Sequence, residues 1–530
     1  MRAPKYKPLL FTTTVRNPER LKMLLSILID FNQQILSNEL ATTIVCQLIR
    51  YGLYRPQKQK ASIKNKWNTT PEGVFADYIL SDSEVEWMKE NNPQKHKEAG
   101  FNKGYPSRFA TFFDFAKELG FVYFEIEKPI EFSEIGKRYA SIFSIEIGNE
   151  GEIITRQENP EYEQQAFLQA MSKYQRNNPF IRVLNDNIPL ILLLQTIKKL
   201  NSDSDFNGNG ISRKELPLII FWKDNNDEAL YQRIRKLRKE YGYNPSDEVI
   251  IDICLEEIME GDMKKFKNKS IISEYPDEFI RKMRLTGLFS LRGAGRFLDI
   301  NHNEDKKVDY ILEHYSKYSK FKTEREYFDY MSQIDENLFE IKPIVLDIKK
   351  SEELLSNWLK IYTWNNIKEE LHILGTKNKM SKDNILRFLS NPMRMEFLTS
   401  LAIKSKFPHV RVIPNYPCDD EGLPTSTAGG IGNKGDIDCI EYKNGILVEV
   451  TLAEGRMQTI MEIWPISRHL EAFQQKYKLN SQCIFIAPSI FKDSEKQIKY
   501  VKAEENLQIY PFTINEFINY IENATQLYKI

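Results

Sequence analysis

The sequence predicts a multidomain protein: a mainly helical N-terminal region with winged-helix-like modules, followed by a C-terminal α/β domain with a mixed sheet. Three observations support this fold class. The 530 residues are enough for two to four domains. Two segments of the N-terminal half share the order helix, glycine, strand, turn, strand. From about residue 339 the expected order becomes α-α-β-β-β-α-β-α-β-α.

Composition limits the class of protein. Hydrophobic residues make up 41% and charged residues 28% of the chain, which is typical of a soluble protein with real cores. Lys+Arg and Asp+Glu both count 74, so the net charge is zero and nucleic-acid binding requires local basic patches. Five scattered cysteines without a C-x-x-C pair indicate a reducing compartment. With no apolar run near ~18 residues and no signal peptide, we expect a cytoplasmic protein without a membrane partner.

The two similar segments lie near residues 106–140 and 276–300. In the first, a helix from Pro106 ends near Gly120, and in the second, a helix from Pro276 ends near Gly287. Two strands follow each helix, and residues 293–295 (GAG) form the second turn. This is the shape of the second half of a winged helix. Such modules bind DNA often but also build protein contacts, so both roles stay open.

Basic side chains gather on these modules. On the second module we expect Arg281 or Arg284 to read a base and Arg292 and Arg296 to hold phosphate, because arginine pairs bidentately with guanine or phosphate. The alternative is a solvated basic face. On the first module the next DNA-binding candidates are Lys103 and Arg108.

The middle of the chain is expected to connect two regions. Residues 301–340 are charged and helical, without a strong apolar stripe, which indicates a linker. One long helix is then expected over residues 352–374, and a helix restarting at Pro392 presents Glu396.

Residues 435–469 read as a β-hairpin followed by a helix. Asn444-Gly445 is the strongest short signal for a two-residue hairpin loop, and it would pair Asp438 with Thr451. Since side chains alternate along a strand, Asp436, Asp438, Glu449 and Thr451 then share one face.

Acids crowded on one face repel each other unless a cation lies between them. Asp436, Glu449 and the carbonyl of Val450 offer the oxygen ligands that Mg²⁺ prefers, and Glu462, four residues after Gln458 on a helix, adds a third carboxylate. Acidic residues on a solvated hairpin face are common, so the pair alone is a weak signal. The glycine-rich loop before it, STAGGIGNKG, favours a ligand because it lets backbone approach closely.

The run from Gly435-Asp436 through Val448-Glu449-Val450-Thr451 to Gln458, Glu462 and PISRH, followed by CIFIAP, resembles the AlwI family of type IIS restriction endonucleases. These are nucleases of the PD-(D/E)XK fold, and their relatives include BstNBI-like strand-nicking enzymes. The resemblance is strong over residues 390–525. It is weaker through the N-terminal half, where TGLFSLRG and ELGFVYFE resemble recognition-domain segments.

The resemblance implies roles for single residues. Asp436 and Glu449 match the metal-binding acids, Glu462 the helix-borne acid and Glu396 the upstream glutamate. Thr451 occupies the place of the usual lysine, which leaves open the group that activates water.

Three residues around the site have supporting roles, and two of these roles stay open. Gln458 is expected to support the site by hydrogen bonding. Glu396 either orients the metal shell or caps a helix packing contact. His469 either contacts phosphate or is a structural histidine at a helix start.

These implications give the expected function: a Mg²⁺-dependent type IIS-like endonuclease that binds an asymmetric sequence of double-stranded DNA and cuts at a short distance. Residues 1–300 are the expected DNA-recognition region, 301–340 the helical linker and 341–530 the restriction-endonuclease-like domain. Alternatives are a strand-specific nicking enzyme, the large subunit of a heterodimeric enzyme, or a winged-helix regulator with an inactive nuclease domain. Expected partners are a transient dimer or small nuclease subunit and a cognate DNA methyltransferase.

Overall fold

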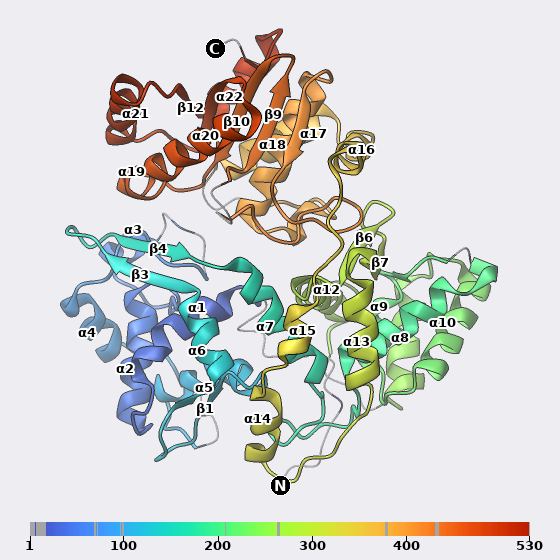
Figure 1. Cartoon of the computed structure of the whole chain (residues 1–530). Coiled ribbons are helices and arrows are strands. Elements are labelled where there is room, and N and C mark those ends of the chain that lie inside the picture. The colour runs from blue at the N-terminus through green and yellow to red at the C-terminus, as the bar shows by residue number, and fades with distance from the viewer. Residues whose placement is uncertain are drawn as a thin grey trace. The chain divides into compact units, whose positions relative to one another are not determined.

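The computed structural model describes residues 6, 17–67, 70, 73–95, 97, 100–206, 208–261, 266–376, 380–429 and 434–528. The chain divides into two compact units, Met1–Pro343 and Ile344–Ile530 (Figure 1). Most described elements are helices, and the C-terminal unit holds a five-stranded mixed sheet. The predicted mixed sheet is therefore confirmed.

The N-terminal unit is mostly helical. Its α-helices are α1 Arg20–Leu28, α2 Asn38–Arg50, α3 Ala61–Trp67, α4 Asp82–Glu90, α5 Pro106–Glu118, α6 Glu134–Ser141, α7 Pro160–Lys173, α8 Pro189–Asn201, α9 Leu216–Phe221, α10 Asp227–Tyr241, α11 Asp247–Asp252, α12 Tyr275–Leu285, α13 Asp305–Tyr315, α14 Glu324–Ser332 and α15 Glu336–Glu340. Its strands are β1 Val122–Tyr123, β2 Glu131–Phe132, β3 Phe143–Ile147, β4 Ile153–Gln157, β5 Ile211–Ser212, β6 Phe289–Arg292 and β7 Phe297–Ile300.

Both helix–glycine–hairpin segments are present. Helix α5 is followed by the antiparallel pair β1–β2, and α12 by β6–β7. Gly120 and Gly287 both have a φ of +78°, so each ends its helix in the left-handed region that glycine enters freely. The second hairpin has an unpredicted third strand, because β5 pairs with β7 from far upstream in the sequence. The winged-helix character of these modules stays a prediction.

Residues 301–340, expected to be a linker, form α13, α14 and α15 of the N-terminal unit. Tyr327, Phe328 and Met331 of α14 are buried, and Gln175 N donates to the Tyr327 hydroxyl at 3.0 Å. Three apolar residues on a nine-residue helix are too few for a visible stripe, yet they suffice to dock it. The boundary between the units lies after this segment, at 343/344.

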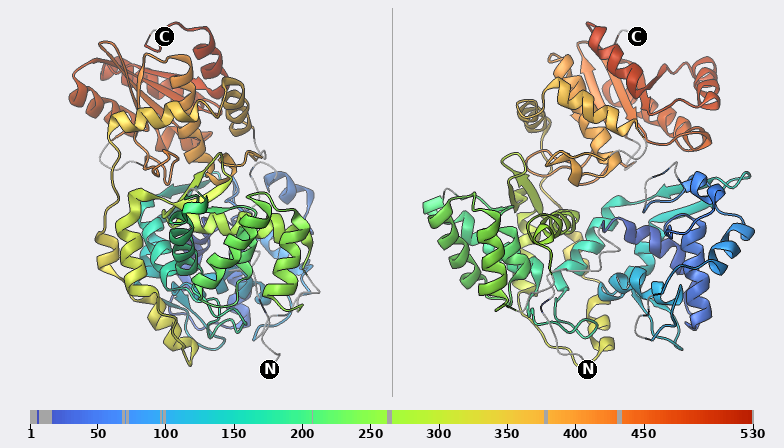
Figure 2. Two further views of the ribbon diagram at one scale, coloured as in Figure 1. Left: turned by 90° about the vertical axis from the view of Figure 1, so that its right-hand side faces the viewer. Right: turned by 180° about the vertical axis from the view of Figure 1, so that it is seen from behind.

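The C-terminal unit is an α/β layer structure. Its elements are α16 Ile348–Trp358, α17 Trp364–Leu374, α18 Asn391–Lys406, β8 Arg411–Pro414, β9 Ile437–Glu441, β10 Asn444–Val450, α19 Arg456–Met461, α20 Ile463–Tyr477, β11 Asn480–Ala487, α21 Lys492–Glu504, β12 Ile509–Thr513 and α22 Ile514–Asn523. The strand order is β12-β11-β10-β9-β8. The pairs β10–β11 and β11–β12 are parallel, whereas β8–β9 and β9–β10 are antiparallel (Figure 2).

The single helix expected over residues 352–374 is wrong. Helix α16 ends at Trp358, and α17 begins at Trp364. Thr363 explains the break, since its side chain accepts from the Asn366 N–H and the Asn366 side chain accepts from the Thr363 N–H. This reciprocal capping box starts a new helix where apolar periodicity alone suggested continuity.

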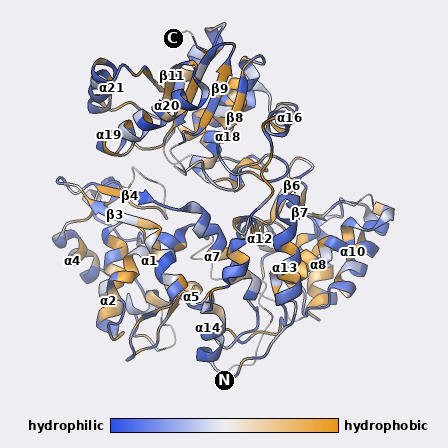
Figure 3. Ribbon diagram, viewed as in Figure 1, coloured by the Kyte–Doolittle hydropathy of each residue, from blue (hydrophilic) through white to orange (hydrophobic). Residues whose placement is uncertain are grey.

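Helices α20 and α21 cover one face of the sheet. Leu447 of β10, Cys483 and Phe485 of β11 and Ile509 of β12 form a buried cluster with apolar side chains of these two helices. Much of the sheet has the orange of hydrophobic residues in Figure 3. Val448 and Ile484, on the opposite face of the same strands, are also fully buried. Both faces of the sheet are thus covered, which explains the near-continuous apolar run CIFIA of β11. No described helix has the length and apolar character needed to span a membrane.

Candidate active site

The hairpin that carries the acidic residues turns at a different place from the one predicted. Asn444 pairs with Glu441 and Ile446 with Cys439, so the turn residues are Tyr442 and Lys443, and Tyr442 has a φ of +58°. The predicted Asn444-Gly445 loop is therefore wrong. Gly445 is needed for packing instead, because a Cβ there would lie 2.5 Å from the Phe473 ring.

The predicted face of the acids survives this correction. The observed pairing differs from the predicted pairing by four residues, and an even shift leaves every side chain on its original face. Asp438 pairs with Leu447, so it shares a face with Glu449, two residues further along β10. That face is covered by α20, which makes the acids enclosed instead of solvated.

Four carboxyl groups from separate parts of the C-terminal unit meet beside β9 and β10. Asp436 directly precedes β9, Glu449 lies in β10, Glu462 lies at the junction of α19 and α20, and Glu396 lies in α18. Glu396 and Glu449 are buried, whereas Asp436 and Glu462 are half-buried. Gly435 lets the chain pass this cluster, because a Cβ there would lie 2.4 Å from Glu449 Oε1.

The electrostatics of the cluster reflect this crowding. Burial and then the charge of Glu449 raise the pKa of Asp436 well above its ordinary value. Burial raises the pKa of Glu449 as well, with Glu462 and Glu396 as the next causes. The pKa of Glu396 is raised by burial and by Asp436, and the pKa of Glu462 is raised by burial. The four groups therefore resist full ionisation unless positive charge is supplied.

Backbone and histidine donors partly offset the repulsion. The Val450 N–H donates to Asp436 Oδ2 at 2.8 Å, and the Ala428 N–H donates to Glu396 Oε2 at 3.0 Å. His469 Nδ1 lies 2.9 Å from Glu449 Oε1, on the second turn of α20. Burial, followed by the neighbouring Arg468, lowers the pKa of His469, so the ring is mostly neutral at neutral pH. His469 therefore contacts a carboxyl group of the cluster. A contact between His469 and phosphate stays a prediction.

Thr451 and Gln458 lie on two sides of the cluster. The Thr451 hydroxyl donates to Glu462 Oε1 at 2.7 Å. Gln458 contacts backbone only: its amide donates to the carbonyl oxygens of Ala453 and Ser489 and accepts from the Phe491 N–H. Gln458 thus supports the loops around the site without touching the carboxyl groups.

Asp438 shares the acidic face but is paired separately. Its carboxylate accepts from Lys476 at 2.9 Å, Tyr477 at 2.8 Å and Asn415 at 2.9 Å. Asn415 also donates to the Gly435 carbonyl at 2.8 Å, so it fixes the backbone that leads into Asp436. Sequence reasoning missed Asn415 because nothing local marks it, and its partners lie at least 20 positions away.

The donor chemistry of the cluster fits a hard divalent cation. Carboxylates are the ligands of Mg²⁺, which is usually bound through one or two of them and keeps several waters. The charges of Asp436 and Glu449 oppose each other, and a cation between the two carboxyl groups would relieve that repulsion. Over the described ranges, no group of three or more His, Cys, Asp or Glu side chains is already placed to hold a metal ion.

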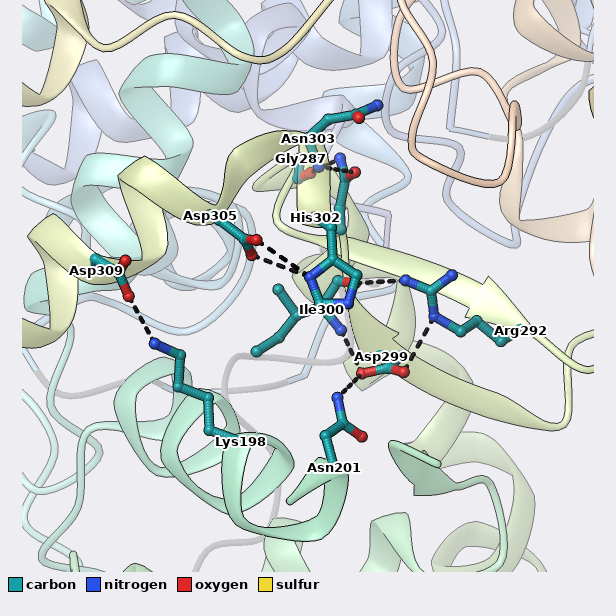
Figure 4. A network of polar contacts seen from close by, with 11 residues as sticks. Lys198, Asn201, Gly287, Arg292, Asp299, Ile300, His302, Asn303, Asp305 and Asp309 are labelled. Carbon is teal, nitrogen blue, oxygen red and sulfur yellow. Dashed lines mark hydrogen bonds and ion pairs between the residues drawn. The ribbon is translucent and has the colours of Figure 1, made fainter. Parts of the chain in front are cut away.

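The predicted DNA-reading arginines differ in their contacts. Arg284 is buried and donates to the Phe289 carbonyl at 3.2 Å. Arg292 donates to Asp299 Oδ2 at 3.0 Å and to the Ile300 carbonyl at 2.8 Å (Figure 4). Asp299 in turn accepts from Asn201 at 2.7 Å, so Arg292 belongs to a network that joins β6, β7 and α8. These two side chains hold the module together.

The remaining basic candidates lie nearer the surface. Arg281 is half-buried on α12, and Arg296 is exposed in the turn between β6 and β7. In the first module Lys103 is exposed, while Arg108 donates to Gln94 Oε1 at 3.0 Å and lies over the Tyr54 ring. Of the two arginines predicted to read a base, Arg281 is thus the more exposed, and base reading stays a prediction.

A family model for the AlwI restriction endonuclease matches residues 117–387 and 362–520, which together exceed half of the chain. An acidic cluster in such a chain defines a class of enzyme, the nucleases that hydrolyse phosphodiester bonds of DNA. The chain belongs to the AlwI restriction endonuclease family.

Comparison with curated proteins gives no match. Among solved structures, the small subunit of the heterodimeric restriction endonuclease R.BspD6I is similar at 22% identity and a TM-score of 0.26, over 30% of this chain and 78% of that one. Restriction endonuclease FokI is similar at 11% identity and a TM-score of 0.25, over 99% and 97% of the two chains. The structure of FokI bound to DNA is similar at 13% identity and a TM-score of 0.22, over 96% of this chain and 95% of that one. TM-scores this low carry no structural argument.

Proposed function

We propose that this chain is a Mg²⁺-dependent type IIS-like restriction endonuclease. In this proposal the N-terminal unit binds an asymmetric sequence of double-stranded DNA, and the C-terminal unit hydrolyses a phosphodiester bond a short distance away. The observation that carries the proposal is the enclosed cluster of Asp436, Glu449, Glu462 and Glu396 in a chain of the AlwI family.

The residues of the cluster divide into two roles. Asp436 and Glu449 would hold the cation, and the Val450 N–H keeps one oxygen of Asp436 fixed while the other stays available. When bound, Mg²⁺ lowers the pKa of a coordinated water and offsets the negative charge that develops on the phosphate. Half-buried Glu462 faces the same space from the α19–α20 junction and would bind a second cation or orient the attacking water.

Glu396 and His469 support this arrangement from behind. Glu396 accepts from the Ala428 N–H and so holds the start of the glycine-rich loop near Asp436. The contact of His469 with Glu449 fixes the orientation of that carboxylate, as hydrogen-bonded neighbours do for metal ligands. These contacts favour an intact site over the alternative of a regulator with an inactive nuclease domain.

One observation favours a second candidate, a strand-specific nicking enzyme or the large subunit of a heterodimeric enzyme. The described residues of each chain bring together one carboxyl cluster, which serves one DNA strand at a time. Cutting both strands then requires a transient dimer or a small nuclease subunit.

Supercoiled plasmid incubated with the purified chain and Mg²⁺ tests these readings on one gel. Linear product supports double-strand cleavage, open-circular product that persists supports nicking, and uncut plasmid that still binds the protein supports the regulator. Asp436→Ala or Glu449→Ala should abolish cleavage and leave specific DNA binding largely intact. Full cleavage by either variant in Mg²⁺ would overturn the assignment of the site.

A further inference from the structure

The side chain of Thr451 occupies the position where the PD-(D/E)XK pattern has a lysine, and its hydroxyl is part of a closed chain of hydrogen bonds. The Ala453 N–H donates to Thr451 Oγ1 at 3.0 Å, and Thr451 Oγ1 donates to Glu462 Oε1 at 2.7 Å. A hydroxyl has a single hydrogen, so the N–H donor from Ala453 leaves that hydrogen for Glu462. The direction of the contact is therefore set by the backbone.

The other half of the ring runs through Gln458. The Gln458 side-chain Nε2 donates to the Ala453 carbonyl at 3.1 Å. The backbone carbonyl of Gln458 accepts from the Glu462 N–H at 3.1 Å. We call Thr451, Ala453, Gln458 and Glu462 the Thr451 ring. The ring joins the end of β10 to the junction of α19 and α20, and Gln458 also anchors it to Ser489 and Phe491.

Glu462 needs such support because of its place in the chain. It separates α19 from α20 and has φ −107° and ψ −49°. Its N–H donates to the Gln458 carbonyl and its carbonyl accepts from the Ile466 N–H, which fixes its backbone, while the Thr451 hydroxyl fixes the orientation of its side chain. A lysine in place of Thr451 would bring a positive charge beside Glu462 and neutralise it. A threonine holds the carboxylate by a neutral hydrogen bond and leaves its negative charge available to a cation.

We propose that Thr451 is a positioning residue that holds Glu462 in the orientation used for divalent-cation binding, in place of the lysine of the wider fold. The proposal rests on the proposed function, since it concerns the same carboxyl cluster. It assigns Gln458 the supporting part of the same device. Thr451 acts through Glu462 and itself contacts neither substrate nor cation.

Three full-length variants test the hydroxyl: Thr451→Val, which keeps the shape, Thr451→Ala, which leaves room for water, and Thr451→Ser, which keeps the donor. Binding of Mn²⁺ alone is measured by calorimetry without DNA, and the Mg²⁺ concentration for half-maximal plasmid cleavage is measured separately. We expect Thr451→Val to weaken Mn²⁺ binding about tenfold, as loss of a contact to a metal ligand does, and Thr451→Ser to retain wild-type binding. Thr451→Ala replaces Thr451→Val in this comparison if the latter does not fold.

The same measurement in a Glu462→Gln background decides whether Thr451 acts through Glu462. If it does, Thr451→Val has no further effect there, and in the wild-type background it lowers kcat without changing KM for DNA. Wild-type Mn²⁺ affinity in the folded Val or Ala variant, equal loss in Thr451→Ser, or an undiminished effect beside Glu462→Gln overturns the proposal. Because Mn²⁺ binding is read without DNA, a wild-type protein that binds Mn²⁺ but leaves DNA uncut counts against the proposed function alone.

Discussion

At the scale of single residues, the acidic cluster was predictable because its geometry depends on parity along a strand. Asp436, Glu449 and Glu462 were found from their spacing, and an error in the hairpin turn left their common face intact. The donors to the neighbouring acids Asp438 and Glu396 were not predictable. Asn415, Ala428 and Tyr477 reach the acidic face from separate segments, and only the tertiary fold brings them there.

The raised pKa values of the cluster predict how the stability of the metal-free protein depends on pH. A carboxyl group whose pKa is raised on folding binds more protons in the native state than in the unfolded state. Its contribution to stability is therefore full below the ordinary pKa, which is 3.8 for Asp436 and 4.5 for Glu449. The contribution is lost as the pH rises from there toward the raised pKa of the folded state. We expect the melting temperature of the C-terminal unit without metal to fall over this window, relative to a variant that lacks one of the charges.

Asp436→Asn provides that comparison, since it removes one charge and keeps the shape. Thermal melts of both proteins at a series of pH values, in chelator, should show a smaller decline for Asp436→Asn. Added Mg²⁺ should stabilise the wild type and have less effect on the variant, because only binding to the native state raises stability. Parallel pH profiles of the two proteins in chelator would count against repulsion within the cluster.

At the scale of elements, the chain order was largely predictable and the boundaries were not. The two helix–glycine–hairpin segments and the α/β order after residue 339 were confirmed. The helix over residues 352–374 was not, because a capping box at Thr363 overrides apolar periodicity. Residues 301–340 looked like a linker because their apolar pattern is weak: the docked face of α14 has only three buried side chains.

The arginines of the second module give a prediction about this element. Arg296→Ala should weaken DNA binding alike for all sequences and reduce the salt slope by about 1, because an exposed arginine in a turn is placed for phosphate. Arg292→Ala should instead destabilise the N-terminal unit by about 1–3 kcal/mol, since it leaves buried Asp299 without its charged partner. Titrations at several salt concentrations and denaturant unfolding separate the two effects. If Arg296→Ala lowered stability and Arg292→Ala weakened DNA binding instead, the turn between β6 and β7 would not face DNA.

At the scale of the whole molecule, the division at 343/344 gives each unit its own core. Residues buried in the N-terminal unit, such as Tyr327 and Met331, extend close to the boundary, and the C-terminal unit begins its own packing with Leu354 and Leu355. The sequence indicated two regions through a change in element order. The predicted change lies near residue 339, and the contact-based division of the chain lies at 343/344.

This division predicts that specific DNA binding and cleavage reside on separate fragments. A fragment of residues 1–343 retains α14 and α15, so we expect it to fold cooperatively and bind the same DNA sequence as the full chain without cutting it. A fragment that ends at residue 300 removes α13 to α15 and exposes the side chains against which Tyr327 and Phe328 pack. It should therefore be markedly less stable, which makes it the control for the position of the boundary.

Both fragments would be compared by thermal melting and by titration against cognate and random duplexes. The 1–343 fragment should keep an affinity for cognate DNA within about tenfold of that of the catalytically inactive full-length Asp436→Ala variant. Such a result follows if phosphate and base contacts both lie in this unit, since those contacts dominate affinity and specificity. A folded 1–343 fragment with no preference over random DNA would instead place sequence recognition in residues 344–530, and the modular reading of the chain would be wrong.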